Sequence, residues 1–314
     1  MNNLTDINYL KSFLKHFGLK PKHYLGQNFL VDQDVLDEIL AAAELKKTDT
    51  VLEVGPGIGT LTFELVKHAG KVIAVEKDAR LVELLRKNSN IEYRSTKQIQ
   101  ISNDQNSKSR LDISALDLDI VSSFGFRVSN LRLVNQDVLR FHLDKHIQDP
   151  YKVVANIPYY LTSALLQYFL EQKNKPHLMV LMVQKEVAER IVARPGNLSI
   201  LGISVQFYAD AEIIAIVSKK NFWPMPEVDS TILKIVPKDK FPEIKDHKLF
   251  FRIVKAGFAA KRKQVHNTFR NGLGLTDEQT EKLLAAAGIN RQSRAQELSL
   301  GQWINFYQAF RKLK

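Results

Sequence analysis

Four consecutive residues, Asn156, Ile157, Pro158 and Tyr159, carry groups that could activate an aromatic amine. The amine of adenine is a poor nucleophile because its lone pair is delocalised into the ring. Two acceptors, the Asn156 side-chain oxygen and the Ile157 carbonyl, would bind its hydrogens and favour a pyramidal nitrogen, and Pro158 would fix the backbone that aims the carbonyl. Tyr159 offers a face on which an extruded base can stack. Taken alone, an ordinary proline turn after a strand explains these residues equally well.

A glycine-rich turn and a downstream acid suggest a nucleoside site. The run from Val51 to Gly59 reads as a strand, three glycines and a helix start, and Glu76 follows 19 residues after Gly57. A carboxylate at the end of the second strand of an open α/β sheet reaches ribose hydroxyls. A dinucleotide turn has the spacing G-x-G-x-x-G, whereas this one has G-x-G-x-G and carries Glu53 before it. An acid there suits the ammonium and sulfonium of S-adenosylmethionine better than a pyrophosphate, which favours the methyl donor.

Two further residues could complete such a site. Phe222 opens an aromatic and proline-rich run that ends at Ser230, and its ring could form the opposite side of a base sandwich with Tyr159. An aromatic-capped turn before the last strand is the alternative. Asp137 ends another predicted strand and could accept a hydrogen bond from the adenine amine of the donor, or it could simply cap the next helix.

The basic charge is concentrated at the ends of the chain. The net charge is +11, with +3 in residues 1–30, −1 in residues 31–236 and +9 in residues 237–314. An amphipathic helix predicted over Phe250–Phe269 carries Lys261, Arg262 and Lys263. Beside a base-modifying site, this cluster is interpreted as an RNA phosphate contact rather than as a solvated helix face.

The elements that must position these residues alternate along the chain. Strands are predicted at 50–55, 71–76, 131–137, 151–156, 177–183, 209–217 and 230–236, with helices at 34–44, 60–68, 79–87, 163–171 and 185–192 between them. This order indicates an α/β fold with a parallel sheet and helices on both faces.

Two segments break the alternation. Residues 94–129 are rich in Ser, Asn, Gln and Asp and are interpreted as an insertion. After Pro237 the chain turns helical, with helices at 249–260, 277–287 and 301–312. The predicted domains are therefore 1–236, which binds the methyl donor, and 237–314, a small basic helical domain that binds RNA.

Several classes of protein are excluded or disfavoured by composition. The chain has no cysteine, which excludes disulfides, zinc–thiolate sites and cysteine nucleophiles, and no metal is expected. The first residues lack the continuous apolar run of a secretory signal, and no uncharged stretch approaches the roughly 20 residues needed to span a bilayer. A cytoplasmic protein that acts as a monomer is expected.

The chain resembles the KsgA family of ribosomal RNA adenine dimethyltransferases. The matching segments cover nearly the whole chain: Tyr24–Leu30, Leu52–Thr62, Val75–Asp78, Gln136-Asp137, Asn156–Tyr159, Val183–Arg190, Phe222–Ser230 and Arg294–Ser299. The resemblance implies a Rossmann-like class I methyltransferase sheet and a site for S-adenosylmethionine. It also implies that this site is lined by Asn28, Leu30, Gly55, Glu76, Asp137 and Asn156.

The same resemblance implies the reaction and the substrate. It implies that the N6 amines of two adjacent adenosines near the 3′ end of small-subunit (16S) RNA are each methylated twice, during maturation of the small ribosomal subunit. Three other functions are kept open: a resistance-type methyltransferase of large-subunit RNA, a ribosome-assembly factor whose enzymatic activity is lost or dispensable, and a nicotinamide oxidoreductase. The basic tail argues against the first, the intact Asn156–Tyr159 motif argues against the second, and both argue against the third.

Overall fold

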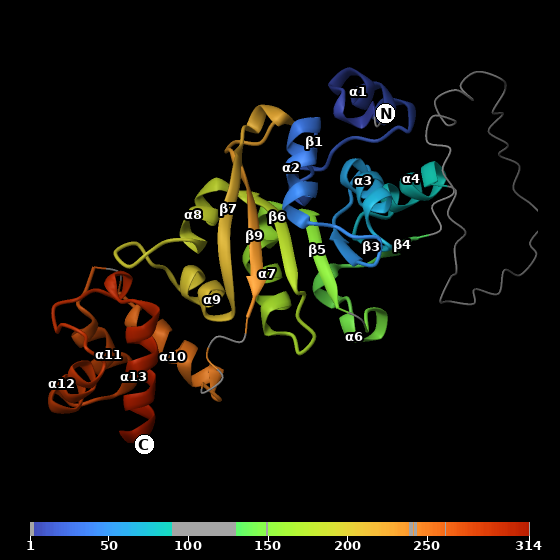
Figure 1. The fold of residues 1–314 in the computed structure, drawn as a ribbon. Coiled ribbons are helices and arrows are strands. Elements are labelled where there is room, and N and C mark those ends of the chain that lie inside the picture. Colours follow the sequence, from blue (N-terminus) through green and yellow to red (C-terminus); the bar gives the residue numbers. More distant parts are fainter. Residues whose placement is uncertain are drawn as a thin grey trace, which may run out of the picture.

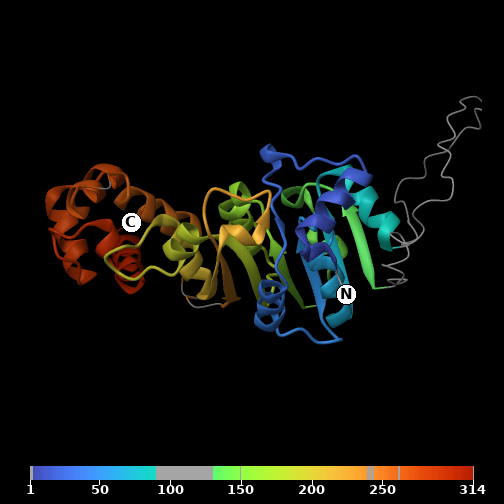
Figure 2. The ribbon, with the colours of Figure 1, turned by 90° about the horizontal axis from the view of Figure 1, so that it is seen from above.

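A seven-stranded sheet forms the centre of the computed structural model, with helices on both faces and a helical C-terminal part beside one edge (Figure 1). The structure describes residues 3–89, 130–148, 150–238, 241, 244–260 and 262–313. The molecule is elongated when seen from above, with the C-terminal helices at one end and the N-terminal segment toward the other (Figure 2).

The strands of the large sheet lie in the order β4-β3-β2-β5-β6-β9-β7. The first five of these pair in parallel, and β9 is antiparallel to both β6 and β7. Two short strands, β1 and β8, pair separately and antiparallel. The bounds are β1 (Phe29–Leu30), β2 (Thr50–Val54), β3 (Lys71–Glu76), β4 (Leu131–Asn135), β5 (Tyr151–Asn156), β6 (Leu178–Gln184), β7 (Ala209–Val217), β8 (Phe222–Trp223) and β9 (Ser230–Pro237).

Helices cover both faces of the sheet because its strands are apolar on both sides. Neighbouring residues of a strand point to opposite faces, so Val51 joins the core under α2 (Gln33–Ala43) and α3 (Thr60–His68), while Leu52 joins the core under α7 (Thr162–Glu171) and α9 (Ile200–Tyr208). The remaining helices of this part are α1 (Ile7–His16), α4 (Ala79–Ser89), α6 (Leu143–His146) and α8 (Lys185–Ile191). Helix α1 packs with α4 around Phe29 in a third apolar cluster.

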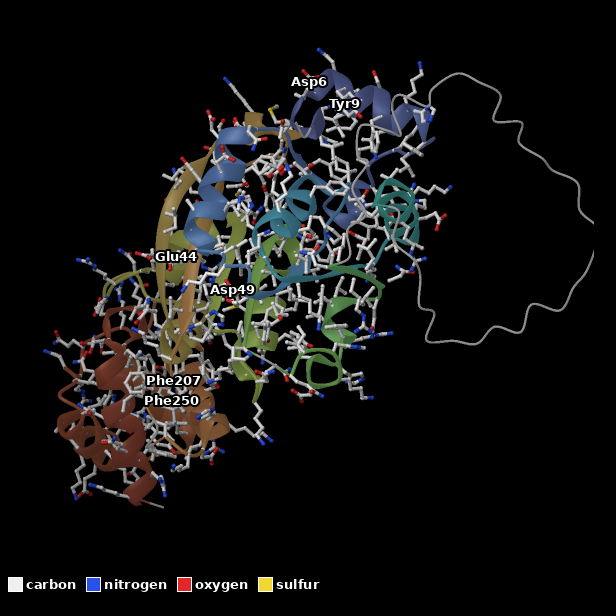
Figure 3. All side chains as sticks on the ribbon, turned by 45° about the vertical axis from the view of Figure 1, so that its right-hand side comes forward. Asp6, Tyr9, Glu44, Asp49, Phe207 and Phe250 are labelled. Atoms are coloured by element: carbon white, nitrogen blue, oxygen red, sulfur yellow. The ribbon has the colours of Figure 1, made fainter. Side chains whose placement is uncertain are left out.

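Four C-terminal helices share one core that includes Trp303, and α10 and α13 also contact α9. The four helices are α10 (His247–Gly257), α11 (Val265–Leu273), α12 (Asp277–Ala286) and α13 (Leu300–Leu313). The rings of Phe207 on α9 and Phe250 on α10 stack with their centres 4.7 Å apart, at the junction that Figure 3 labels. One continuous core includes these rings and Trp303. Strand β9 ends at Pro237, and the division into two domains at residues 236 and 237 stays a prediction.

The prediction of one basic helix over residues 250–269 is wrong. Helix α10 ends at Gly257, and α11 begins at Val265. The Val265 amide donates to the Ser293 carbonyl at 2.8 Å, and Gln264 forms an antiparallel bridge with Arg294. These contacts with a distant segment draw the chain out of the helix, so Arg262 and Lys263 of the basic cluster lie on the connection between α10 and α11.

Most of the other predicted elements are confirmed. The predicted bounds are met by strands β3, β5 and β7 and by helix α3. Helices α1, α9 and α11 were not predicted as separate helices. The α9 sequence is apolar almost throughout and gives no amphipathic pattern. The predicted insertion at 94–129 lies outside the described residues. No helix in the described part of the chain is long and apolar enough to cross a membrane.

Candidate active site

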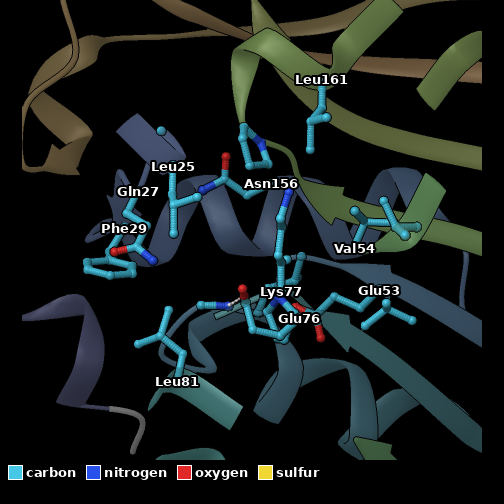
Figure 4. A pocket seen from close by; sticks show the side chains of 18 of the residues that line it. Leu25, Gln27, Phe29, Glu53, Val54, Glu76, Lys77, Leu81, Asn156 and Leu161 are labelled. Carbon is cyan, nitrogen blue, oxygen red and sulfur yellow. Dashed lines mark hydrogen bonds between the residues drawn. The ribbon is translucent and has the colours of Figure 1, made fainter. Parts of the chain in front are cut away.

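A pocket opens where β2, β3, β4 and β5 end, beneath the N-terminal segment that contains β1 (Figure 4). The carboxyl edge of a parallel sheet is the place where open α/β folds bind ligands. The structure brings six predicted cofactor-binding residues together in the lining of this pocket, although they are spread over 129 positions: Asn28, Leu30, Gly55, Glu76, Asp137 and Asn156.

The glycine turn between β2 and α3 needs residues without side chains. Gly57 has a φ of +61°, and a Cβ there would lie 3.2 Å from the Phe29 ring. Gly59 has a φ of +95°, and its Cβ would lie 2.6 Å from both Leu85 and Phe63. The left-handed conformation and these close approaches explain why glycine stands at both positions. The turn brings backbone amides to the pocket wall.

Glu76, at the end of β3, is held in place by backbone amides. Gly57 N–H donates to its Oε2 at 3.2 Å, and Asp78 N–H donates to its Oε1 at 2.8 Å. Burial raises the pKa of the Glu76 carboxyl, and the hydrogen bonds from Asp78, Gly57 and Lys77 oppose that rise. Each carboxylate oxygen keeps a further lone pair, so Glu76 can accept from the two hydroxyl donors of a ribose.

Glu53, in β2, places a second acid in the same pocket lining. It is 1% exposed, and its Oε2 has no hydrogen-bond partner among the described residues. Burial raises its pKa to about 8, the Thr62 side chain opposes this rise, and the charge of Glu76 adds a smaller increase. A buried carboxyl without a partner is costly. A cationic ligand in the pocket would compensate this cost by favouring the ionised form.

Asp137 uses its two oxygens for different partners. One accepts from the Leu139 amide at 3.1 Å and caps the short 3₁₀ helix Val138–Arg140, which confirms the capping alternative. The other accepts from Lys77 Nζ at 2.9 Å, and this hydrogen bond lowers the pKa of Asp137. The role of Asp137 toward the adenine amine of a methyl donor stays a prediction.

Asn156, the last residue of β5, is oriented by the N-terminal segment. Its Nδ2 donates to the Asn28 carbonyl at 3.1 Å, so its Oδ1 is directed away from that carbonyl. Asn156 and Pro158 both line the pocket, and Figure 4 shows the Asn156 side chain pointing into it. Among the described residues, the amide thus has one N–H engaged and its acceptor oxygen available, as an amine-binding role requires.

The other predicted catalytic residues lie beside the pocket. Ile157 is buried, and the Tyr159 hydroxyl is hydrogen-bonded to Ser230 Oγ at 2.6 Å, with the phenol pKa raised by burial. Phe222 is 2% exposed and pairs with Leu30 across β1 and β8. These rings belong to neighbouring segments, but neither Tyr159 nor Phe222 is part of the pocket lining. Their stacking roles stay predictions.

Several pocket-lining residues were not predicted from the sequence, and those with polar groups include Gln27, Lys77 and Tyr160. Tyr160 and Lys77 line the pocket directly after residues that were chosen, and Gln27 precedes Asn28. Gln27 donates to Asp78 Oδ2 at 3.2 Å and accepts from the Lys22 amide at 2.7 Å. It ties the N-terminal segment to the loop after β3. Gln27 and Lys77 lie inside the segments Tyr24–Leu30 and Val75–Asp78 that carry the family resemblance, so the resemblance could have indicated them, whereas Tyr160 lies just outside the Asn156–Tyr159 motif.

Only part of the predicted RNA-binding cluster lies within the described residues. Arg262 and Lys263 are exposed on the connection between α10 and α11, and Lys261 lies outside the described residues. A second basic surface was not predicted. It is a groove between α7, α9 and α10, and its lysines and arginine come from two distant segments: Lys173, Lys175, Lys248, Arg252 and Lys255. The last three are exposed on one face of α10.

Comparisons with known proteins agree with this geometry. A sequence profile of the family described as "Ribosomal RNA adenine dimethylase" matches residues 18–108 and 118–312. The chain is 42% identical over 296 residues to "Ribosomal RNA small subunit methyltransferase A" of Dehalococcoides mccartyi strain CBDB1, covering 93% of this chain and 89% of that one. It is 35% identical over 312 residues to the protein of the same name from Clostridioides difficile strain 630, covering 96% and 95%.

Two solved structures share the fold. A dimethyladenosine transferase from Plasmodium falciparum superposes with a TM-score of 0.67 at 23% identity, covering 90% of this chain and 98% of that one. The 23S rRNA methyltransferase ErmE superposes with a TM-score of 0.63 at 23% identity, covering 90% and 99%. The likeness extends over the sheet and the C-terminal helices, so the predicted fold class is confirmed.

Proposed function

The chain belongs to the ribosomal RNA adenine dimethylase family, and on that premise we propose that it dimethylates the N6 amines of two adjacent adenosines near the 3′ end of small-subunit (16S) RNA. The methyl donor is S-adenosylmethionine. The observation that carries the proposal is the oriented amide of Asn156, which has its donor on Asn28 and its acceptor available at the pocket. The more similar relatives carry names for small-subunit methyltransferases, which favours that substrate over large-subunit RNA.

The pocket residues suit this cofactor. Glu76 would bind the ribose hydroxyls, Asp137 the adenine amine, and the buried Glu53 would lie on the side of the cationic methionine part. Asn28, Leu30 and Gly55 would line the remainder of the site. When bound, the cofactor supplies an electrophilic methyl group, so neither a metal nor a covalent enzyme intermediate is required.

The chain's own residues prepare the amine. Asn156 Oδ1 and the Ile157 carbonyl accept its two hydrogens and hold the nitrogen pyramidal, so that its lone pair points toward the methyl carbon. Pro158 fixes the backbone between them. Tyr159 and Phe222 hold the extruded base between their rings. Because Phe222 is buried, the segment that carries it must move when the base enters.

The biological setting follows from the same premise. The substrate is ribosomal RNA within a precursor of the small subunit, held by the basic residues at 261–263, and the protein acts as a monomer in the cytoplasm. The C-terminal residues 237–314 act as the RNA-binding domain, and residues 1–236 as the domain that binds the cofactor.

The proposal is tested by methyl transfer. Labelled S-adenosylmethionine is incubated with the protein and with undermethylated small or large ribosomal subunits, and the modified bases are mapped by mass spectrometry. Dimethyladenosine in small-subunit RNA alone is the expected result. Label in large-subunit RNA would indicate the resistance-type activity. Donor binding without any transfer would indicate an assembly factor.

A further inference from the structure

Some of the exposed large apolar side chains belong to the segments that border the pocket. In the described part of the chain there are eight, and three of them, Tyr24, Leu139 and Tyr160, stand next to pocket-lining residues or line the pocket themselves. The only aromatic side chains among the eight are Tyr24, 74% exposed, and Tyr160, 57% exposed. Exposed apolar side chains on neighbouring segments often mark a binding surface.

The two tyrosines belong to segments that touch. A Cβ built on Gly26 would lie 3.2 Å from Pro158 Cβ and 3.7 Å from Tyr160 Cδ1. Tyr24 is two residues before Gly26, and Tyr160 is four residues after Asn156. Tyr160 therefore lies beside the segment that carries Tyr24, where both segments border the pocket, and neither ring is used by the reaction described above.

Basic side chains accompany these rings. Lys22 Nζ lies 5.8 Å from the centre of the Tyr24 ring and 3.4 Å from Asp78 Oδ2. Arg80 binds the same carboxylate, and its pKa is raised chiefly by that hydrogen bond, with a smaller effect from Tyr24. A surface that combines an exposed ring with neighbouring cations is suited to a nucleobase and its phosphate.

We propose that Tyr24 and Tyr160 form a stacking site for the nucleobase that neighbours the target adenosine on the same RNA strand. This inference rests on the proposed function. A target base that is turned out of its stack leaves its neighbour with one uncovered face, and an aromatic ring beside the pocket replaces the lost stacking partner. Because every base has such a face, the site recognises the presence of a neighbouring base rather than its identity.

The first test uses kinetics on undermethylated small ribosomal subunits. Tyr24→Ala and Tyr160→Ala are each expected to raise KM for the subunits about tenfold, with kcat changed much less, because stacking of one base on an aromatic ring is worth about that factor or more. Tyr24→Phe and Tyr160→Phe keep the ring and are expected to behave as the wild type. Ile216→Ala, which truncates a 60% exposed side chain on β7, is the control.

Donor binding is measured by calorimetry for each variant, since Tyr160 also lines the pocket. An unchanged Kd for S-adenosylmethionine supports the stacking site. A weaker donor Kd together with an unchanged KM for the subunits would overturn it, because the tyrosine would then serve the cofactor instead.

A second test does not depend on catalysis. A hairpin RNA copied from the 3′ end of small-subunit RNA carries 2-aminopurine at a nucleotide that flanks the two adjacent adenosines, on the 5′ side in one RNA and on the 3′ side in another. The probe is therefore a neighbour of a target base and never the target that stacks on Tyr159. Stacking on tyrosine quenches its fluorescence, so binding to the wild type and to the phenylalanine variants is expected to quench it, and binding to the alanine variants is not. Equal quenching by the alanine variants would overturn the proposal. If the wild type methylates no subunit, the proposed function fails, and the quenching still decides the stacking site.

Discussion

Asn156 shows how a single side chain is prepared for its role by a contact far away in the sequence. Its amide nitrogen donates to the carbonyl of Asn28, 128 positions earlier, and this directs the oxygen away from that carbonyl. The buried Glu53 shows the opposite condition, since no partner among the described residues satisfies its Oε2. The orientation of the Asn156 amide is therefore set by the protein itself, whereas an ionised Glu53 would be stabilised by a cationic ligand.

Asn156→Ala is expected to lower kcat for methyl transfer at least a hundredfold, because removing one preorganised hydrogen-bonding group at a reacting centre costs about 10² to 10³ in rate. The Kd for S-adenosylmethionine should change only a few-fold. Single-turnover transfer to small subunits and calorimetry measure the two quantities. Asn174→Ala, which removes a hydrogen bond to the Ile147 carbonyl away from the pocket, is the control and should keep its kcat. A fully active Asn156→Ala protein would contradict the mechanism.

Glu53→Gln is expected to stabilise the protein without ligand increasingly as the pH rises from about 5 to 8. The pKa of Glu53 is raised from 4.5 to about 8 in the folded state. Over that interval the folded state retains a proton that the unfolded state has lost, so the wild type loses stability as the pH rises. Glutamine has no such proton, and the Tm difference between variant and wild type should therefore grow.

Thermal unfolding at several pH values measures this difference, with the exposed Glu189→Gln as a control. A Tm difference for Glu53→Gln that stays constant with pH would contradict the raised pKa.

Short connections between the helices and strands fix the positions of the pocket residues. The connection from β2 to α3 is five residues long, from Gly55 to Gly59, and contains three glycines with positive φ. It sets both the start of α3 and the amide that holds Glu76. On the other side of the pocket, β1 pairs with β8, so the segment that carries Asn28 is fastened to the one that carries Phe222.

Gly59→Ala is expected to lower the free energy of unfolding by about 2 to 4 kcal/mol, since it adds left-handed strain and an overpacked contact. The Cβ would approach Leu85 and Phe63 to 2.6 Å. Gly288→Ala is the matched control, because Gly288 also has a positive φ, +64°, but no atom within 4 Å of its Cβ position. It should show the strain alone, about 1 to 2 kcal/mol. Equal losses in denaturant titrations would show that the contact costs nothing.

At the scale of the whole molecule, two basic surfaces lie on or beside the C-terminal helices. Arg262 and Lys263 lie on the connection from α10 to α11, and the groove between α7, α9 and α10 adds Lys248, Arg252 and Lys255 on one helix face. Figure 2 shows these helices extending the molecule at the end opposite to the N-terminal segment. Such an arrangement would let both parts of the molecule contact one large RNA, as the proposed function requires.

Replacing Lys248, Arg252 and Lys255 by glutamine is expected to weaken binding to small subunits and to make it less dependent on salt. Each phosphate contact that is lost should reduce the slope of log K against log salt by about 0.7 to 0.9. Filter binding at several salt concentrations measures the slope, and kcat at saturating subunits should be unchanged. The control is the triple variant Lys46→Gln, Lys47→Gln, Lys71→Gln, which also removes three positive charges, but near the amino end of β3. If both triple variants have equal slopes, the groove makes no specific contact with RNA.

The sequence by itself determined the alternation of strands and helices along the chain, the glycine turn with Glu76, the Asn156–Tyr159 motif and the family. These features are local, since they depend on periodicity, turn residues and the sequence of a few neighbouring positions. The same local reasoning extended one helix across residues 250–269, because nothing nearby records the bridge from Gln264 to Arg294.

Only the tertiary structure decided which distant groups meet. It put Nδ2 of Asn156 on the Asn28 carbonyl, buried Phe222 against Leu30, left Glu53 Oε2 without a partner and gathered lysines from residues 173 and 248 along one groove. It also exposed Tyr24 and Tyr160 on segments that border the pocket. Burial and hydrogen bonding arise from packing between segments far apart in the chain, and the local pattern of residues carries no record of that packing.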